Sequence, residues 1–132
     1  MIKEIVSYLQ EELTGYIIGT NIFAGFVPST ITADHLVVIE TGGATEPALK
    51  DFVSMTIQVL AVAAEYQNAR NMAQEVYNLL HGSAGITLPV VITGKKYYAN
   101  TIYAISAPQS LGQDNKGRFV ISTNYILKIQ DA

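Results

Sequence analysis

The hydrophobic pattern changes its period in the middle of the chain, and this change limits the folds that the sequence can adopt. The odd-numbered positions from Val53 to Ala61 are all apolar, and polar residues lie between several of them. A period of two residues predicts a strand with one face in water. From residue 65 to 81 the apolar residues recur at the spacing of a helix: Ala69, Met72, Ala73, Val76, Tyr77 and Leu80. Gly82 is placed to end this helix, so a strand leads directly into a helix here.

Weaker patterns predict one more helix and several strands. Residues 2–13 have helical spacing and stop before Gly15, and the chain ends in a segment that alternates from Phe119 to Ile129. Glycine and proline separate the pieces between them. The elements expected are a helix at 2–13, a short strand and a loop within 16–34, a strand at 35–40, a loop at 41–47, a helix break at 82–85, strands at 88–93 and 97–105 with a tight turn at 93–95, a loop at 108–118 and a last strand from about residue 118.

The order of these elements predicts an α+β fold. Helix, strands, helix and strands follow one another, and two helices are too few to cross over every pair of strands. We therefore expect a mostly antiparallel (mixed) β-sheet with the two α-helices packed on one face. At 132 residues the chain is long enough for one core, and we expect a single domain over residues 1–132.

Charged residues are scarce, which favours a protein that assembles with other subunits. The chain is 49% hydrophobic and 14% charged, against a usual charged share of about 25%. A surface so poor in charge is typical of one that other subunits cover, and the alternative is an ordinary small domain with a neutral polar surface. The formal net charge of −3, without long runs of like charge, argues against a nucleic-acid-binding surface.

No group of residues has the spacing of a catalytic or metal site. The chain has no cysteine, which excludes disulfides, thiolate catalysis and cysteine-bound zinc. His35 and His81 lie far apart in the sequence, and neither has an acidic partner at metal-ligand spacing. Asp114 to Gly117 has the residue types of a calcium loop without its spacing, so a turn is the better interpretation. We therefore expect no enzyme, no cofactor and no bound metal.

The N-terminal segment gives no sign of export or membrane insertion. MIKEIVSYLQEEL is amphipathic and acidic, unlike a secretory signal peptide. The chain also lacks an apolar run near the roughly 20 residues of a membrane span. We expect a soluble protein that is made in the cytoplasm and does not contact a membrane.

Three segments resemble the tail terminator proteins of long-tailed bacteriophages, which are also called minor capsid or tail completion proteins. The first is ETGG at 40–43, after a β-branched strand, and the second is the strand and helix from 53 to 82. The third runs from PQSLGQDNKGRF at 108–119 into the strand STNYILKI at 122–129. Similar proteins have a proline-led loop, a glycine-rich polar turn, an arginine and then an asparagine-aromatic strand at this place.

The resemblance implies a small α+β sandwich and a structural role in the virion. Members of the family close into a hexameric ring at the head-proximal end of the tail tube, where they cap the tube and dock the head connector. The implied partners are other copies of the chain, the major tail tube protein and the head–tail connector, and DNA passes through the channel without being read. The implied location is the tail or neck of a virion made in a bacterial cytoplasm.

The two long loops, 41–50 and 108–118, are the candidates for contacts with neighbouring subunits. A ring needs two different patches that meet head to tail, and weak contacts gain strength when they repeat around it. Arg70, in the expected second helix, is placed to form an ion pair with Glu65 or Glu75, or with a carboxylate of a partner. The residues chosen for the interface are Gln109, Leu111, Asp114, Arg118 and Arg70.

Other functions stay open from the sequence. Another neck or tail component, such as a head-closure or tail tube protein, would share a small fold of this class. A tube protein is expected to polymerise by itself, whereas a terminator is expected to stop at a ring. A protein-interaction adaptor domain of a non-viral protein is the second alternative, and an enzyme is the least favoured because its parts are missing.

Overall fold

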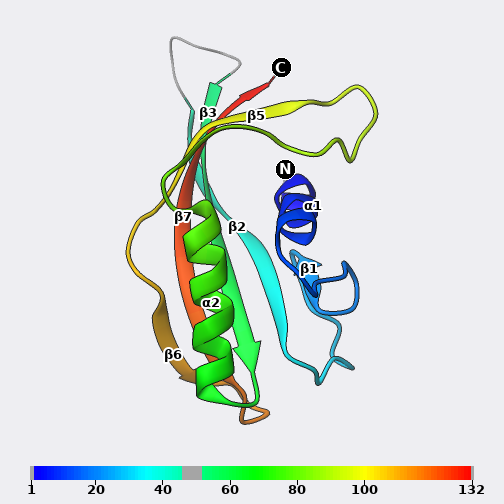
Figure 1. Cartoon of the computed structure of the whole chain (residues 1–132), viewed down its shortest axis with the longest axis vertical. Coiled ribbons are helices and arrows are strands. Elements are labelled where there is room, and N and C mark those ends of the chain that lie inside the picture. Colours follow the sequence, from blue (N-terminus) through cyan, green and yellow to red (C-terminus); the bar gives the residue numbers. More distant parts are fainter. Residues whose placement is uncertain (1, 46–51, 132) are drawn as a thin grey trace.

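The computed structural model describes residues 2–45 and 52–131 and has two helices packed against a twisted sheet (Figure 1). The two segments with the strongest hydrophobic periodicity form the expected elements, a strand at 52–63 and a helix at 66–80. In chain order the elements are α1 (Ile2–Glu12), β1 (Ile22–Ala24), β2 (His35–Thr45), β3 (Phe52–Ala63), α2 (Tyr66–Leu80), β4 (Ser83–Thr87), β5 (Tyr97–Ala104), β6 (Gln109–Gln113) and β7 (Phe119–Asp131).

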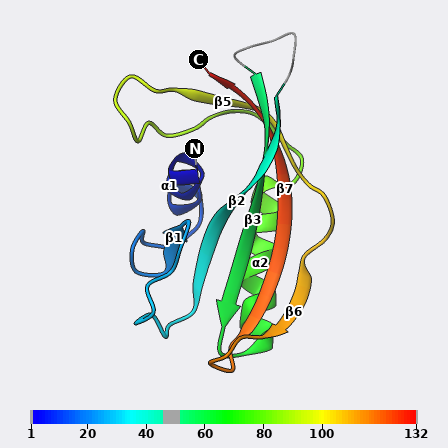
Figure 2. The same cartoon turned by 180° about the vertical axis from the view of Figure 1, so that it is seen from behind.

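The sheet has seven strands and is antiparallel except at one edge. Its order is β1-β2-β3-β7-β5-β4, and β1 runs parallel to β2. Strand β7 is long enough to pair with two strands along the same edge, the one that does not pair with β3. Its second half pairs with β5 and its first half with β6, so β6 forms a separate edge. Strands β1 and β6 therefore lie at opposite edges of the sheet, as Figures 1 and 2 show.

Both helices bury their apolar stripes in one core on one face of the sheet. The alternating residues of β3 that face this core include Ile57 and Val59, and their register partners on β7 are Tyr125 and Thr123. One cluster of buried side chains joins this face to the stripes of α1 and α2. The helical members of the cluster are Ile5, Val6 and Leu9 of α1 and Ala69, Ala73, Val76 and Leu80 of α2. The predicted α+β fold with two helices on one face of a mostly antiparallel sheet is confirmed.

Tyr16, in the segment after α1, packs against the same core as the two helices. It is half-buried, and removal from water raises the pKa of its hydroxyl to about 12, with the negative charges of Glu75 and Asp34 adding to the effect.

Three expectations about strands and loops were wrong. The expected loop at 41–47 begins with strand, since β2 continues to Thr45, and residues 46–51 lie outside the described residues. The segment 88–93, which we expected to be a strand, has no regular structure, and strand β4 lies before it, directly after the helix end that the sequence correctly predicted. The expected loop at 108–118 contains strand β6.

These segments share a local feature that hides a strand. Each contains a glycine with positive φ, which are Gly42 (101°), Gly85 (69°) and Gly112 (88°). At Gly42 and Gly112 the pairing register also shifts, which marks a β-bulge. The hydrogen bonds from neighbouring strands therefore outweigh a local sequence that is typical of loops.

The end of α2 gives a test of how much one backbone conformation contributes to stability. Gly82 follows the helix with φ of 81°, and its N–H donates to the carbonyl of Ile102 at 2.9 Å. We expect Gly82→Ala to lower the free energy of unfolding by about 1 kcal/mol, because alanine is strained in the left-handed region. Gly82→Asn is the matched variant and should lose less, since asparagine tolerates this conformation. Urea unfolding measures both, and equal losses would contradict the explanation.

Candidate subunit interface

Strand β6 lies at an open edge and exposes all five of its residues. It pairs with β7 from Gln109 opposite Ser122 to Gln113 opposite Phe119, and no other strand among residues 2–45 and 52–131 pairs with it. Leu111 falls at the register shift and is 55% exposed. The strand thus presents a free backbone edge together with an exposed apolar side chain.

Residues 109–113, which we call the β6 edge, carry no charged side chain that would oppose pairing, and their protection is limited to the β-bulge at Gly112 and the short length of the strand. Edge strands of soluble proteins commonly carry lysine or another charged residue that prevents contact with a second chain. The sequence here is QSLGQ, without charge or proline, and Pro108 lies just before it. Such an edge is suited to association with another surface.

Arg70 fixes the beginning of this segment to helix α2. Its Nη1 donates a hydrogen bond to the carbonyl oxygen of Pro108 at 3.0 Å. The acceptor is thus a backbone carbonyl, whereas the sequence suggested the carboxylate of Glu65, of Glu75 or of a partner. Arg70 therefore positions the β6 edge from within the chain.

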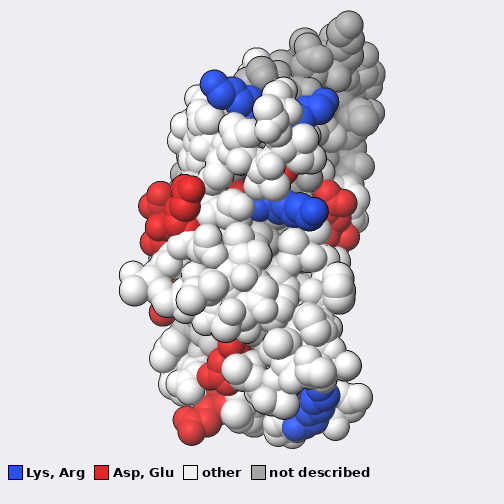
Figure 3. Space-filling view, turned by 90° about the vertical axis from the view of Figure 1, so that its right-hand side faces the viewer, with Lys and Arg blue, Asp and Glu red and all other residues white. Residues whose placement is uncertain are grey.

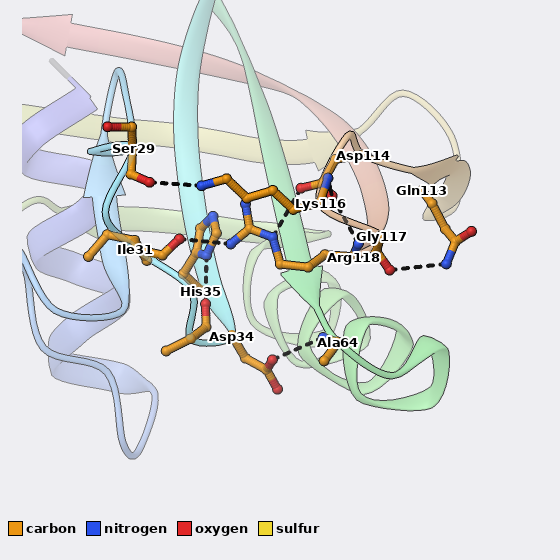
Figure 4. Close-up of polar contacts among 11 residues, drawn as sticks. Ser29, Ile31, Asp34, His35, Ala64, Gln113, Asp114, Lys116, Gly117 and Arg118 are labelled. Atoms are coloured by element: carbon orange, nitrogen blue, oxygen red, sulfur yellow. Dashed lines mark hydrogen bonds and ion pairs between the residues drawn. The ribbon is translucent and has the colours of Figure 1, made fainter.

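A set of polar contacts, which we call the turn latch, holds the other end of the segment (Figure 4). Asp114 Oδ1 accepts from the backbone N–H groups of Lys116 and Arg118, both at 2.9 Å, and its Oδ2 accepts from Arg118 Nε at 3.0 Å. Arg118 Nη1 donates to the carbonyl of Ile31 at 3.0 Å, and Lys116 Nζ donates to that of Ser29 at 2.8 Å. The latch ties the β6–β7 turn to the connection between β1 and β2.

The charge of Asp114 is stabilised by these donors. Removal from water alone would raise the pKa of its carboxyl. The backbone N–H groups of Arg118 and Lys116, and then the Arg118 guanidinium, more than offset this effect and hold the pKa below its usual value. The ion pair of the latch is therefore formed throughout the neutral pH range.

His35 lies close to the latch and is almost completely buried. It is 2% exposed, its Nδ1 lies 2.9 Å from the carbonyl oxygen of Ala33, and its ring meets the Phe23 ring edge-on at 5.8 Å. Burial is the main cause that lowers the pKa of its imidazole, and the hydrogen bond with the Ala33 carbonyl opposes it. The positive charge of Arg118 lowers the pKa further, against the negative charges of Asp114 and Asp34. The folded chain therefore keeps this ring neutral where the unfolded chain protonates it.

This difference predicts a loss of stability in mild acid. Below about pH 6.5 His35 is protonated in the unfolded chain but stays neutral in the folded chain. The free energy of unfolding therefore falls as the pH drops from 7.5 to 5.5. We expect His35→Phe to reduce this pH dependence, because phenylalanine keeps the ring without titrating. Urea midpoints of both proteins at the two pH values provide the measurement. An identical pH dependence in the two proteins would contradict the assignment.

The predicted interface residues fall into two groups in the structure. Gln109 and Leu111 are exposed on the β6 edge, where a partner can reach them. Asp114, Arg118 and Arg70 are engaged within the chain and hold that edge in place. Contact of any of the five with a neighbouring subunit stays a prediction. The sequence did not reveal the strand itself, although the glycine at 112 beside an isolated leucine is a pattern that fits a bulged edge strand.

Neither a metal site nor a membrane-spanning helix is found in the part of the chain that the structure describes. No three histidine or acidic residues among positions 2–45 and 52–131 come together to hold an ion. Neither α1 nor α2 is long and apolar enough to cross a bilayer.

Comparison with known proteins gives a finding at the level of the family. Residues 8–131 match a family described as "Bacteriophage tail terminator protein". The matched range begins within α1 and ends with the last residue of β7, so it includes α2 and every strand of the sheet. No curated protein matches the chain.

Proposed function

Because the chain belongs to the bacteriophage tail terminator protein family, we propose that it forms a ring that ends the growth of a phage tail tube. In this proposal the ring has six subunits and lies at the head-proximal end of the tube, where it stops the addition of tube subunits. It then presents the surface to which the head connector docks. The chain is made in the cytoplasm of the host bacterium and becomes part of the virion.

The observation that carries this proposal is the extent of the family match. A match confined to one hairpin would support no more than a local likeness. This one runs from residue 8 to residue 131 and includes the core face of the sheet and the β6 edge. The family is a structural one, and the proposal gives the chain no catalytic step, no cofactor and no metal.

The β6 edge supports the ring in particular. It is neutral, unpaired on one side and anchored at both ends by Arg70 and the turn latch. A rigid edge loses little conformational freedom when it binds, which favours association. Contacts of this kind that are weak one at a time become strong when they repeat around a closed ring that sits on a symmetric tube end.

The proposed partners are protein surfaces. They are further copies of the chain, the major tail tube protein and the head–tail connector. DNA crosses the ring without sequence recognition, since a chain with a net charge of −3 offers little attraction to phosphates. Separate domains are not required for these contacts, and we propose that residues 1–132 act as one unit.

Electron microscopy of particles made without this gene tests the proposal. Tails of abnormal and variable length, separated from filled heads, are the expected result. Tails of normal length without heads would instead assign the chain to head closure. Long tubes formed by the purified chain alone would make it a tube protein, and intact infectious particles without the gene would refute a role in the virion.

A further inference from the structure

Helix α2 holds the connection between β5 and β6 at two places. Arg70 holds its end, through the hydrogen bond to the carbonyl of Pro108. His81, the C-cap residue of α2, holds its beginning, because the backbone N–H of Ala104 at the end of β5 donates to His81 Nδ1 at 2.9 Å. Residues 105–108 lie between these two attachments and lead into the β6 edge.

The two attachments leave the helix from nearly the same face. Arg70 and His81 are eleven positions apart in the sequence, which is close to three turns and about 16 Å along a helix axis. The connection passes beside α2 between them, as Figures 1 and 2 show. Helix α2 therefore supports the connection at both of its ends.

Burial contributes little to the position of this connection. Residues 105–107 are exposed, and the Ile105 side chain is 57% exposed. The N–H of Ile105 donates to the carbonyl of Asn124 on β7 at 2.8 Å. The place of the connection thus depends on hydrogen bonds, and the bond with His81 is the one whose acceptor can gain a proton near neutral pH.

The His81 ring continues the β4–β5 ladder beyond the point where β4 begins. Strand β4 starts at Ser83, opposite Ile102, and the Gly82 N–H donates to the Ile102 carbonyl at 2.9 Å. The same register places His81 opposite Ala104, where the chain still belongs to the end of α2. The imidazole therefore supplies the acceptor that the carbonyl of a longer strand would have supplied.

This contact requires the neutral form of His81. An acceptor needs a lone pair on Nδ1, so the single proton of the neutral ring lies on Nε2. The orientation of the imidazole is set by the Tyr77 ring, which stacks on it at a centroid distance of 4.8 Å. Proton uptake puts a hydrogen on Nδ1, and two donors then face each other. Protonation of His81 therefore breaks the bond to Ala104.

Two tyrosines are the titratable groups that face this contact. Tyr77 stacks on the imidazole from α2, and the buried Tyr125 of β7 is the register partner of Ala104. Tyrosine carries no charge in the pH range where histidine changes its own. Neither side chain therefore supplies a charge that would oppose the release.

Charged side chains are sparse on the elements around His81. Strand β4 and residues 104–108 contain no acidic or basic side chain, and the charged residues of α2 are Arg70 and Glu75. Glu75 lies six positions before His81, on another side of the helix, and Arg70 lies about three turns away. The side of the molecule that carries α1 and β1 is similarly poor in charge, since most of its described surface is uncharged (Figure 3). A protonated imidazole thus finds no carboxylate on β4 or the connection that would replace the lost bond.

We propose that His81 is a pH-sensitive positioning residue, which holds the connection to the β6 edge while its imidazole is neutral and releases it when the imidazole gains a proton. In mild acid Arg70 is then the remaining attachment of the connection to α2. The contact belongs to the single chain, whereas its consequence for assembly, a β6 edge that is less well supported in acid, rests on the proposed ring.

Hydrogen exchange at the Ala104 amide of the full-length monomer, followed by NMR, tests the release. Protection is the exchange rate relative to that of an unstructured peptide at the same pH. We expect it to fall about tenfold between pH 7.5 and 5, as the loss of one hydrogen bond predicts. The reference is the Leu88 amide, which donates to the Tyr97 carbonyl in the same ladder. A general loss of stability, including that from His35, lowers both amides alike, so the ratio of the two is compared.

Two substitutions separate the acceptor from the ring. His81→Asn places an amide oxygen near the position of Nδ1 and does not titrate, so Ala104 should stay protected at both pH values. His81→Phe keeps a ring against Tyr77 and removes the acceptor, so the protection of Ala104 should be about tenfold lower at both. In the natural chain at neutral pH, the ring nitrogen shifts of His81 should place the proton on Nε2.

The outcomes separate this inference from the proposed function. A ratio of Ala104 to Leu88 protection that did not change with pH would overturn the role of His81. A fall in His81→Asn as large as that in the natural chain, or a proton on Nδ1 at neutral pH, would overturn it as well. All of these measurements use the monomer. Abnormal tail length in the gene deletion would therefore still support the terminator role if His81 proved insensitive to pH.

Discussion

Replacing Leu111 by aspartate is expected to leave the fold intact and to prevent the chain from assembling. Leu111 is 55% exposed in the single chain, so a carboxylate there costs little before association. In a subunit contact of the proposed ring the same carboxylate would be removed from water without a partner, which is strongly unfavourable. We expect the pairwise contact to weaken by roughly a hundredfold or more, and the loss repeats at every interface of the ring. Sedimentation of the purified variant and of the natural chain measures the effect.

A matched substitution decides whether the site is responsible. Gln74→Glu adds the same charge at an exposed position of α2 and should assemble normally. Normal assembly of Leu111→Asp would contradict the role of the β6 edge.

Replacing Arg118 by methionine is expected to lower the free energy of unfolding by about 2 kcal/mol. The Arg118 side chain is only 14% exposed, and it donates to the Asp114 carboxylate and to the carbonyl of Ile31. Hydrogen bonds with a charged partner typically contribute about 1.5–3 kcal/mol, and methionine keeps the aliphatic contacts while removing them. The turn latch should open as a result, and the β6–β7 turn should exchange its amide hydrogens faster. Urea unfolding and hydrogen exchange at a concentration where the chain is monomeric provide both measurements.

Lys116→Met is the control for the latch. Lys116 is exposed and donates to the single carbonyl of Ser29, so its removal should cost less than about 0.5 kcal/mol. If Arg118→Met left the stability of the monomer unchanged and weakened assembly alone, Arg118 would be an interface residue and not a support of the β6 edge.

The strongest patterns of the sequence predicted most of the core. Strand β3 and helix α2 lie within a residue or two of their expected bounds, since a burial pattern of eleven or more residues leaves little choice of secondary structure. The missed strands were short or terminal pieces, at 41–45, 83–87 and 109–113, and each contains a glycine with positive φ. Their hydrogen-bond partners lie far away in the sequence, and a local pattern carries no information about them. The apolar run 88–93 predicted a strand that does not form. Its residues Val90, Val91 and Ile92 are exposed on a connection without regular structure.

The candidate interface was predictable as a region but not as a set of roles. The sequence singled out the segment 108–118 as a candidate for subunit contacts, which stays a prediction, and the structure places Gln109 and Leu111 on the exposed strand within it. That Asp114, Arg118 and Arg70 would support this edge from inside depends on carbonyl oxygens of Ile31 and Pro108, which no pattern of side chains reveals.

The central claim is that this chain ends tube growth as a ring in which the β6 edge takes part in the subunit contacts. Its most direct test is to polymerise the tube protein of the same particle in the presence of the purified chain and to measure tube lengths by electron microscopy. The natural chain should shorten the tubes and appear as a ring at one end, whereas Leu111→Asp should leave their lengths unchanged. Tubes that grow to the same length with and without the natural chain, or that incorporate it along their length, would contradict the claim.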